Sequence, residues 1–223
     1  MIKSLRIALV GGTGHQGPGL ALRWALAGHE VFIGSRRAEK AERVAGELSE
    51  ALRPIGVQYE FGHGVNPDVV AKADVIVFTI PFGGVRATCE GLRDQIRPGA
   101  VVVSPVVPMR KADFGLIADL PEEGSAAELI AALLPQAKVV GAFHTVSAGL
   151  LKDIPKPIEG DVVVCGDDEE AKRLVMGLVE DIPNLRPLDG GPLAYSRVLE
   201  ALTPLLITMG KRLGNPNLGI KFI

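Results

Sequence analysis

One short stretch constrains the fold of this chain more than any other: residues 12–17, GTGHQG, have the glycine spacing G-x-G-x-x-G. They follow an apolar run at residues 7–10, which is typical of a strand buried on both faces of a parallel sheet. A predicted helix at 19–27 and a second predicted strand at 30–33 come next. In this context the glycines allow a tight turn, close approach of backbone to a pyrophosphate, and close packing of helix on strand. The stretch therefore predicts a dinucleotide site, with a purely structural turn as the alternative.

The end of the second predicted strand indicates which dinucleotide binds. NAD-specific sites usually carry an acidic residue about 20 residues after the glycine turn, where it bonds the ribose hydroxyl. Here the chain has Ser35, Arg36 and Arg37, with Lys40 one helical turn further on and no carboxylate at the strand tip. A hydroxyl and guanidinium groups suit a 2′-phosphate, so NADP is favoured. The alternative is that these cations are the solvated start of the next helix.

Composition excludes several classes of function. A hydrophobic content of 47% argues against disorder, and 223 residues suffice for one good core or a larger domain with a small appendage. Every apolar run is broken well before the roughly 18 residues that cross a bilayer, and a strand begins almost at once, so we expect a cytoplasmic protein without a signal peptide. The net charge of −2 and the 4% aromatic content argue against nucleic-acid and membrane partners.

The cysteines and histidines do not suggest a metal centre. Cys89 and Cys165 are far apart and lack neighbours at metal-ligand spacing, so we expect neither a disulfide nor a metal site and interpret both as buried hydrophobes. His15, His29 and His63 are expected at the surface.

The remaining chain alternates predicted strands and helices up to about residue 145, which indicates a doubly wound parallel sheet. Asn66 is expected to cap a short helix, and Ser125 to cap another through a capping box. The predicted strands lie at 57–61, 75–81, 100–104 and 138–143, and the predicted helices at 38–52, 66–73, 84–92 and 129–134.

After residue 146 the pattern changes. A polar, proline-rich linker at 153–160 precedes a predicted strand at 161–165, a helix to about 181, a strand at 186–188 and a last apolar helix at 191–213. Pro204 should kink or break that helix, whose apolar faces suit either a core or a subunit contact. The expected fold is a Rossmann-type doubly wound parallel sheet, residues 1–150, followed by a small C-terminal α+β domain, residues 151–223.

Eight short motifs, spread over the whole chain, carry a family resemblance. The chain resembles the F420-dependent NADP oxidoreductases, also called NADPH:coenzyme F420 reductases, which move a hydride between NADP(H) and a deazaflavin. The matching segments are GGTGxxG at 11–17, GSRRxxK at 34–40, TIP at 79–81, SPVVP at 104–108, FHT at 143–145, VCGDD at 164–168, RPLDGGPL at 186–193 and LGIKF at 218–222.

The resemblance implies NADP and coenzyme F420 as cofactors, a small-molecule deazaflavin substrate and a homodimer. It places the pyrophosphate at the glycine turn, the 2′-phosphate at the second strand tip, and the nicotinamide and deazaflavin rings at later strand ends. The implied cofactor-binding residues are Gly12, Thr13, Gly14, His15, Gln16, Gly17, Ser35, Arg36, Lys40, Ile80, Val107, His144, Val146 and Ala148. No side chain is assigned as a certain catalytic group and no metal is implied; His144 is expected to orient a ring.

Other interpretations of the sequence stay open at this point. His144 could be an ordinary packed histidine at a strand end. The same nucleotide-binding half could serve another NADP-dependent reductase, acting on imines or ferric centres, or a non-enzymatic NADPH-sensing module. Two segments differ from the family pattern: FGG at 82–84 replaces a bulkier segment, and HTVSA at 144–148 replaces HTIPA.

Overall fold

The computed structural model describes residues 4–223, which form a mostly parallel sheet of eight strands in the order β10-β9-β8-β5-β4-β1-β2-β3. Every neighbouring pair in this order is parallel except β8 and β9, which are antiparallel. The strands are β1 (Arg6–Val10), β2 (Glu30–Ser35), β3 (Gly62–Val65), β4 (Val75–Phe78), β5 (Val101–Ser104), β8 (Lys138–Gly141), β9 (Gly160–Gly166) and β10 (Leu185–Asp189). The predicted Rossmann-type sheet is confirmed.

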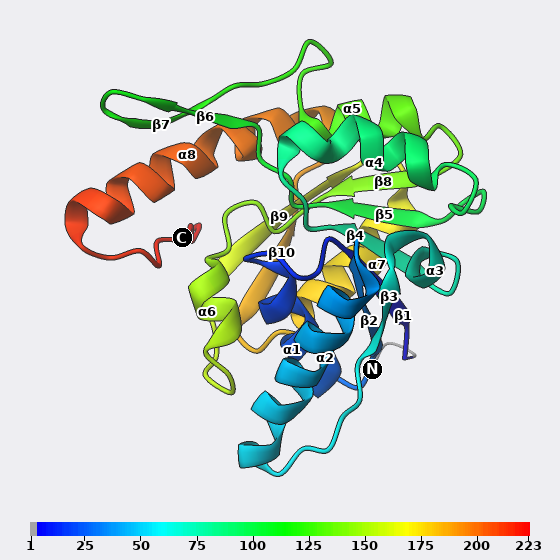
Figure 1. Cartoon of the computed structure of the whole chain (residues 1–223). Helices are drawn as coiled ribbons and strands as arrows, with labels where there is room; N and C mark the ends of the chain where they lie inside the picture. The colour runs from blue at the N-terminus through cyan, green and yellow to red at the C-terminus, as the bar shows by residue number, and fades with distance from the viewer. Residues whose placement is uncertain (1–3) are drawn as a thin grey trace.

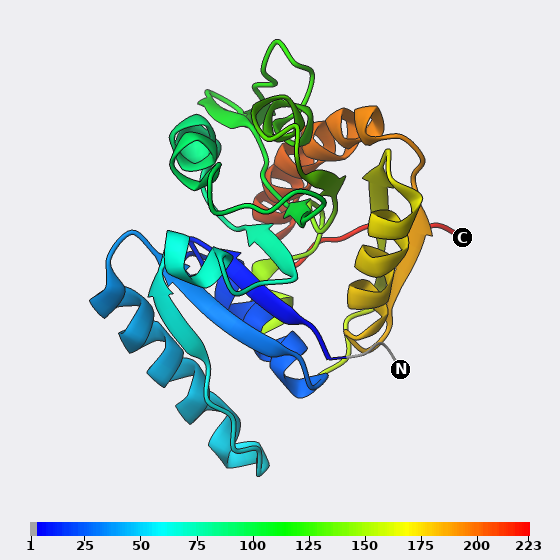
Figure 2. The same cartoon turned by 90° about the vertical axis from the view of Figure 1, so that its right-hand side faces the viewer.

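Helices cover both faces of this sheet (Figures 1 and 2). One face packs against α1 (Gly17–Leu26), α2 (Ala38–Leu52) and α7 (Glu169–Glu180). The other face packs against α3 (Asn66–Val70), α4 (Val85–Leu92) and α5 (Ala126–Leu133). Because apolar side chains of β1, β4 and β5 alternate between the two cores, the uniformly apolar strands are explained by burial on both faces.

The C-terminal part extends the same sheet and then leaves it. β9 and β10 form one edge, and α8 (Ser196–Leu213) lies against the antiparallel hairpin of β6 (Met109–Ala112) and β7 (Gly115–Ala118), beside which it projects in Figure 1. The last residues return to the sheet, where the Asp161 amide donates to the Ile220 carbonyl at 2.9 Å. Within residues 4–223, no helix has the length and apolar character needed to cross a membrane.

The strand predicted at 57–61 was wrong: the third strand is Gly62–Val65. The Tyr59 hydroxyl bonds the backbone of the neighbouring strand segment, donating to His29 O at 2.7 Å and accepting from Val31 N at 2.8 Å. Pairing starts at Gly62, opposite Phe32, where a Cβ would collide with the Phe32 ring. The pairing of β2 with β3 therefore begins at Gly62, where the absence of a side chain leaves room for the Phe32 ring.

Two other local expectations also need correction. Asn66 does not cap α3, because the N-cap residue is Val65. The Asn66 side-chain oxygen instead accepts a hydrogen bond from the Gly11 amide at 3.2 Å, which connects α3 to the glycine turn. His29 is buried rather than exposed, because its Nδ1 accepts from Leu5 N at 3.1 Å and its Nε2 lies 2.8 Å from an Asp181 oxygen.

Other expectations are confirmed or refined. Ser125 caps α5, and both cysteines are buried. The last helix begins at Ser196, after a 3-10 turn, and passes through Pro204 without a break. The β6–β7 hairpin was not predicted.

A buried guanidinium anchors both α6 (Ala148–Lys152) and the loop that follows it. Arg23, on α1, is 2% exposed and donates to four backbone carbonyls at 2.7–3.1 Å. The acceptors are Leu150, Leu151, Asp153 and Lys156. Helix α1 thereby fixes α6, the helix that begins at Ala148.

Replacing Arg23 with Met should lower the free energy of unfolding by about 3–5 kcal/mol, because the buried carbonyls lose their donors. Urea denaturation measures the loss. Arg43→Met is the matched control, since the Arg43 side chain is 63% exposed and pairs with Glu47 one turn away; it should cost less than about 1 kcal/mol. Equal losses in the two variants would contradict the anchoring role of Arg23.

Candidate active site

The glycine turn at the end of β1 is held by close backbone packing. The Gly12 amide donates to Leu9 O at 3.0 Å and to Gly34 O at 2.9 Å. A Cβ on Gly17 would lie 2.7 Å from the Gly12 Cα, and one on Gly12 would lie 2.8 Å from the Leu9 Cβ. Gly14 differs, because a Cβ there would meet nothing closer than 3.4 Å. Gly12 and Gly17 are therefore required by the fold, whereas Gly14 leaves its backbone open to a ligand.

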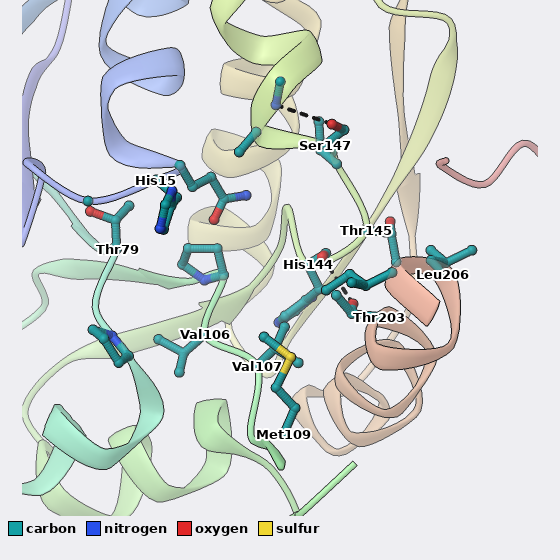
Figure 3. Close-up of a pocket in the computed structure, with 18 of the residues that line it drawn as sticks. His15, Thr79, Val106, Val107, Met109, His144, Thr145, Ser147, Thr203 and Leu206 are labelled. Atoms are coloured by element: carbon teal, nitrogen blue, oxygen red, sulfur yellow. Dashed lines mark hydrogen bonds between the residues drawn. The ribbon is translucent and has the colours of Figure 1, made fainter. Parts of the chain in front are cut away.

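A cavity of about 780 Å³ lies beside this turn, at the carboxyl ends of β4, β5 and β8 (Figure 3). Parallel strands place their carboxyl ends at one edge, which is where ligands bind in such sheets. Eight of the residues implied by the family resemblance line the cavity: Gly14, His15, Gln16, Ile80, Val107, His144, Val146 and Ala148.

The other implied residues lie outside the cavity lining. Gly12, Thr13 and Gly17 form the turn itself. Ser35 ends β2, next to the turn through the Gly12–Gly34 hydrogen bond, and its side-chain oxygen accepts from the Arg37 amide at 3.3 Å. Arg36 is exposed and Lys40 is half-buried on the following helix. A 2′-phosphate site would therefore lie on the far side of the turn from the cavity.

Several cavity residues were not predicted from the sequence. Leu206 and Ile207 come from α8, Asn217 and Leu218 from the returning C-terminal segment, and Met109 from the start of the hairpin. The sequence signals near them were the LGIKF motif at 218–222 and the SPVVP motif at 104–108, which ends just before Met109. The cavity thus has one wall built by the nucleotide-binding half and another built by the C-terminal half.

Gln16 links the glycine turn to the strand end that carries His144. Its side-chain amide donates to the Phe143 carbonyl at 2.9 Å. Phe143 has a left-handed backbone, with φ of 65°, and its ring packs edge-on against Trp24 with the ring centroids 5.7 Å apart. Non-glycine residues in this conformation are uncommon, and they persist where the surroundings hold them. Here the hydrogen bond from Gln16 and the packing of the Trp24 ring keep Phe143 in this conformation.

His144 is buried beneath the cavity, and Figure 3 shows its side chain extending toward Val107 and Met109. The side chain is 1% exposed, and its Nε2 lies 3.8 Å from Oε1 of Glu200, beyond hydrogen-bond distance. The His144 carbonyl accepts from the Thr203 hydroxyl at 3.0 Å. Burial lowers the pKa of His144 to about 4, so the imidazole is uncharged at neutral pH.

Glu200 is the buried acid on the other side of this histidine. Its carboxyl oxygens accept from the Ala126 amide at 2.7 Å and the Ala127 amide at 3.1 Å, at the start of α5. Burial raises the pKa of Glu200 to about 8, against the opposing effect of these two amides. At neutral pH the histidine and the acid are therefore both uncharged.

The cavity wall is largely apolar, which suits the binding of flat rings. Among the described residues that line it, there is no Asp, Glu, Lys or Arg. Within residues 4–223, moreover, no His, Cys, Asp and Glu side chains gather in a group that could hold a metal ion. An apolar cavity of this volume is typical of small-molecule sites.

The glycine turn, the parallel sheet and the apolar cavity at the strand ends define a Rossmann-fold oxidoreductase of the nicotinamide-dependent class. Residues 6–108 match the family model described as NADP oxidoreductase, coenzyme F420-dependent. The chain is 38% identical to the F420-dependent NADP reductase of Methanocaldococcus jannaschii, over 97% of both chains. It is also 38% identical to that of Methanothermobacter thermautotrophicus, over 97% of this chain and 94% of the relative. The chain belongs to the family of F420-dependent NADP oxidoreductases.

A solved structure shows the same fold over the whole chain. A protein from Arthrobacter sp. FB24, described as an F420-dependent NADP-reductase, superposes with a TM-score of 0.83 and 24% identity, covering 99% of this chain and 100% of that one.

Gly14→Val should abolish dinucleotide binding while leaving the fold intact, because a side chain at Gly14 would occupy the space where the pyrophosphate meets the backbone. Calorimetric titration with NADPH and thermal melting test the two halves of this expectation. Gly12→Val is the contrasting variant, since a Cβ there collides with Leu9 and should lower the melting temperature. Wild-type NADPH affinity in a folded Gly14→Val protein would show that the turn does not face the pyrophosphate.

The two buried groups predict how stability depends on pH. The pKa of Glu200 is about 8 in the folded protein, against an ordinary value of 4.5. Between these two pH values the folded state binds the proton and the unfolded state does not, so rising pH lowers the free energy of unfolding. His144, with a pKa of about 4 when folded against 6.5 ordinarily, raises stability with pH from 4 to 6.5. The two effects oppose each other up to pH 6.5, above which only the loss from Glu200 continues.

Between pH 6.5 and 8, the free energy of unfolding should therefore fall further in the wild-type protein than in the Glu200→Gln variant. The difference between the two should be on the order of 2 kcal/mol. Urea unfolding at half-unit pH steps measures both slopes. Glu128→Gln, which removes the neighbouring acid on α5, should keep the wild-type slope. A Glu200→Gln protein with that same slope would assign the pH dependence to another group.

Proposed function

We propose that this protein catalyses reversible hydride transfer between NADP(H) and the deazaflavin coenzyme F420. The observation that carries the proposal is the cavity of about 780 Å³, bounded by the glycine turn and free of charged side chains among its described lining residues. Hydride transfer between two flat rings needs contact, alignment and exclusion of water, all of which an apolar cleft provides. Relatives that are 38% identical over 97% of this chain are F420-dependent NADP reductases.

The residues present fit both cofactors. Gly14 leaves room for a pyrophosphate, while Ser35, Arg36 and Lys40 offer a hydroxyl and two cations to a 2′-phosphate. Ile80, Val107 and Ala148 would line the nicotinamide side, and Val146 would lie where the second ring stacks, with His144 beneath the floor. When bound, the nicotinamide and the deazaflavin supply the hydride donor and acceptor.

The side chains of this protein therefore act by position. The backbone of the turn holds the phosphates, the apolar walls exclude water, and His144 supports the floor of the cavity. The polar edge of His144 at Nε2 faces Glu200, and its side chain is 1% exposed, so a role as proton donor to a ligand is disfavoured.

Three further features belong to the same proposal: the roles of the two parts of the chain, the homodimer and the place of action. Residues 1–150 would act as the NADP-binding part and residues 151–223 would complete the deazaflavin site. A homodimer is supported by large apolar side chains exposed on α8 and on the β6–β7 hairpin, among them Val198, Leu205, Leu213 and Phe114. The expected place of action is the cytoplasm.

Mixing the protein with NADPH and oxidised F420, and following the visible absorbance of the deazaflavin, tests the function directly. We expect loss of the oxidised deazaflavin band with NADPH and much slower loss with NADH. Turnover of an imine or a ferric chelate without deazaflavin turnover would identify a different reductase. Tight NADPH binding with no turnover of any acceptor would indicate a sensing module.

Arg36→Ala should weaken NADPH binding by about 1.5–3 kcal/mol, the range of a hydrogen bond to a charged group, and should leave NADH binding nearly unchanged. Titration calorimetry with both dinucleotides measures the difference. Arg43→Ala is the control, because that exposed arginine lies two turns into α2 and pairs with Glu47. Equal losses for the two dinucleotides would show that Arg36 does not recognise the phosphate.

A further inference from the structure

One buried strip of polar side chains on α8 is not explained by packing alone. Ser196, Glu200 and Thr203 follow each other at helical spacing and are at most 8% exposed. The opposite side of α8 carries exposed apolar residues instead. Polar side chains on a buried helix face are costly unless they have a partner or a task.

All three residues of this strip lie against the strand end that carries His144. Thr203 donates to the His144 carbonyl, and Glu200 lies 3.8 Å from the His144 ring. A Cβ on Gly141 would collide with the Ser196 hydroxyl and lie 3.2 Å from Cε1 of His144, so the end of β8 must be a glycine for α8 to come this close. Glu200 and Thr203 therefore contact His144 itself, and Ser196 contacts the strand end just before it.

Glu200 in turn is fixed from behind by α5. Both of its oxygens accept backbone amides at the start of that helix, where Ser125 already serves as the N-cap. The His144 Nε2 has no hydrogen-bond partner among residues 4–223. The one acid that faces this nitrogen is thus immobilised by two hydrogen bonds of its own.

From this geometry we infer that Glu200 is a positioning residue of the active site, which packs beside the His144 ring, 3.8 Å from its Nε2, and keeps the ring in place under the cavity floor. Glu200 does not touch the ligands; it acts through His144, whose ring supports the wall on which the deazaflavin stacks. The inference rests on the proposed function for this last clause only, since the contact of Glu200 with His144 is a property of the protein itself.

Few other ionisable groups approach this pair. Glu128 on α5 faces Glu200 and is paired with Arg197 of α8, with a 3.3 Å contact from Arg197 Nε to Glu128 Oε2. On β9, Cys165 lies by Ser196, and burial raises the pKa of its thiol to about 11, so it stays protonated. Around neutral pH, a change of charge next to His144 therefore points to Glu200.

Nitrogen-15 NMR of the histidine rings tests the pairing without any substrate. The His144 signals are assigned by their loss in His144→Asn. In wild-type protein they should shift with an apparent midpoint near pH 8, as Glu200 ionises beside the ring. The shift should vanish in Glu200→Gln and persist in Glu128→Gln, which weakens the same end of α5 without facing His144. His144 signals that do not move near pH 8 in wild type, or that move equally in Glu200→Gln, would overturn the inference.

A double-mutant cycle in the deazaflavin assay tests the action through His144. Glu200→Gln should lower kcat about tenfold with little change in KM for NADPH, and His144→Asn should lower kcat by about 10- to 100-fold. The double variant should be no slower than His144→Asn alone. Losses that multiply would show that Glu200 acts independently of His144 and would overturn the inference.

The NMR measurement and the activity assay distinguish a failure of this inference from a failure of the proposed function. A protein without deazaflavin activity contradicts the proposed function but leaves the NMR result to decide whether Glu200 and His144 are coupled. Thermal melting of Glu200→Gln and Glu128→Gln shows how much each variant weakens the cap of α5, and a kcat loss shared by both would assign the effect to that cap.

Discussion

The close approach of Gly12 and Gly17 is the contact on which the rest of this structure depends. A Cβ on Gly17 would lie 2.7 Å from the Gly12 Cα, so the first turn of α1 can reach β1 only because both residues lack side chains. That approach places Trp24 of α1 fully in the core, where its ring meets Phe143. It also leaves Gly14 exposed at the edge of the cavity. One packing constraint thus builds both the core and the surface that faces a dinucleotide.

Most of the sheet could be predicted from the sequence because its signals are local. Apolar runs specified β1, β4, β5 and β8, and the Ser125 capping box specified the start of α5. The third strand could not be placed, because its start depends on the Phe32 ring lying over Gly62 in a distant segment. The β6–β7 hairpin was missed because its side chains are half-buried or exposed and carry little hydrophobic periodicity.

The candidate site likewise contains residues that could be predicted from the sequence and residues that could not. The family resemblance implied that Ile80, Val107 and His144 bind the cofactors, and for Ile80 the end of an apolar strand gave the same indication. They lie together at the cavity because parallel strands end at one edge. Leu206, Asn217 and Glu200 were not predicted, since their places depend on how α8 and the C-terminal segment return to that edge. Gln16 was expected to meet the pyrophosphate; its side chain bonds the Phe143 carbonyl, and whether it also meets a ligand stays a prediction.

The strand end at Phe143 and His144 is held from three directions, and this explains how a cavity whose described lining has no Asp, Glu, Lys or Arg can favour a reaction. Gln16 from the glycine turn bonds the Phe143 carbonyl, Trp24 packs against the Phe143 ring, and Thr203 from α8 bonds the His144 carbonyl. A left-handed Phe143 costs on the order of 1 kcal/mol, which such contacts offset. Hydride transfer between stacked rings requires a wall that does not move. The contacts around His144 serve that requirement.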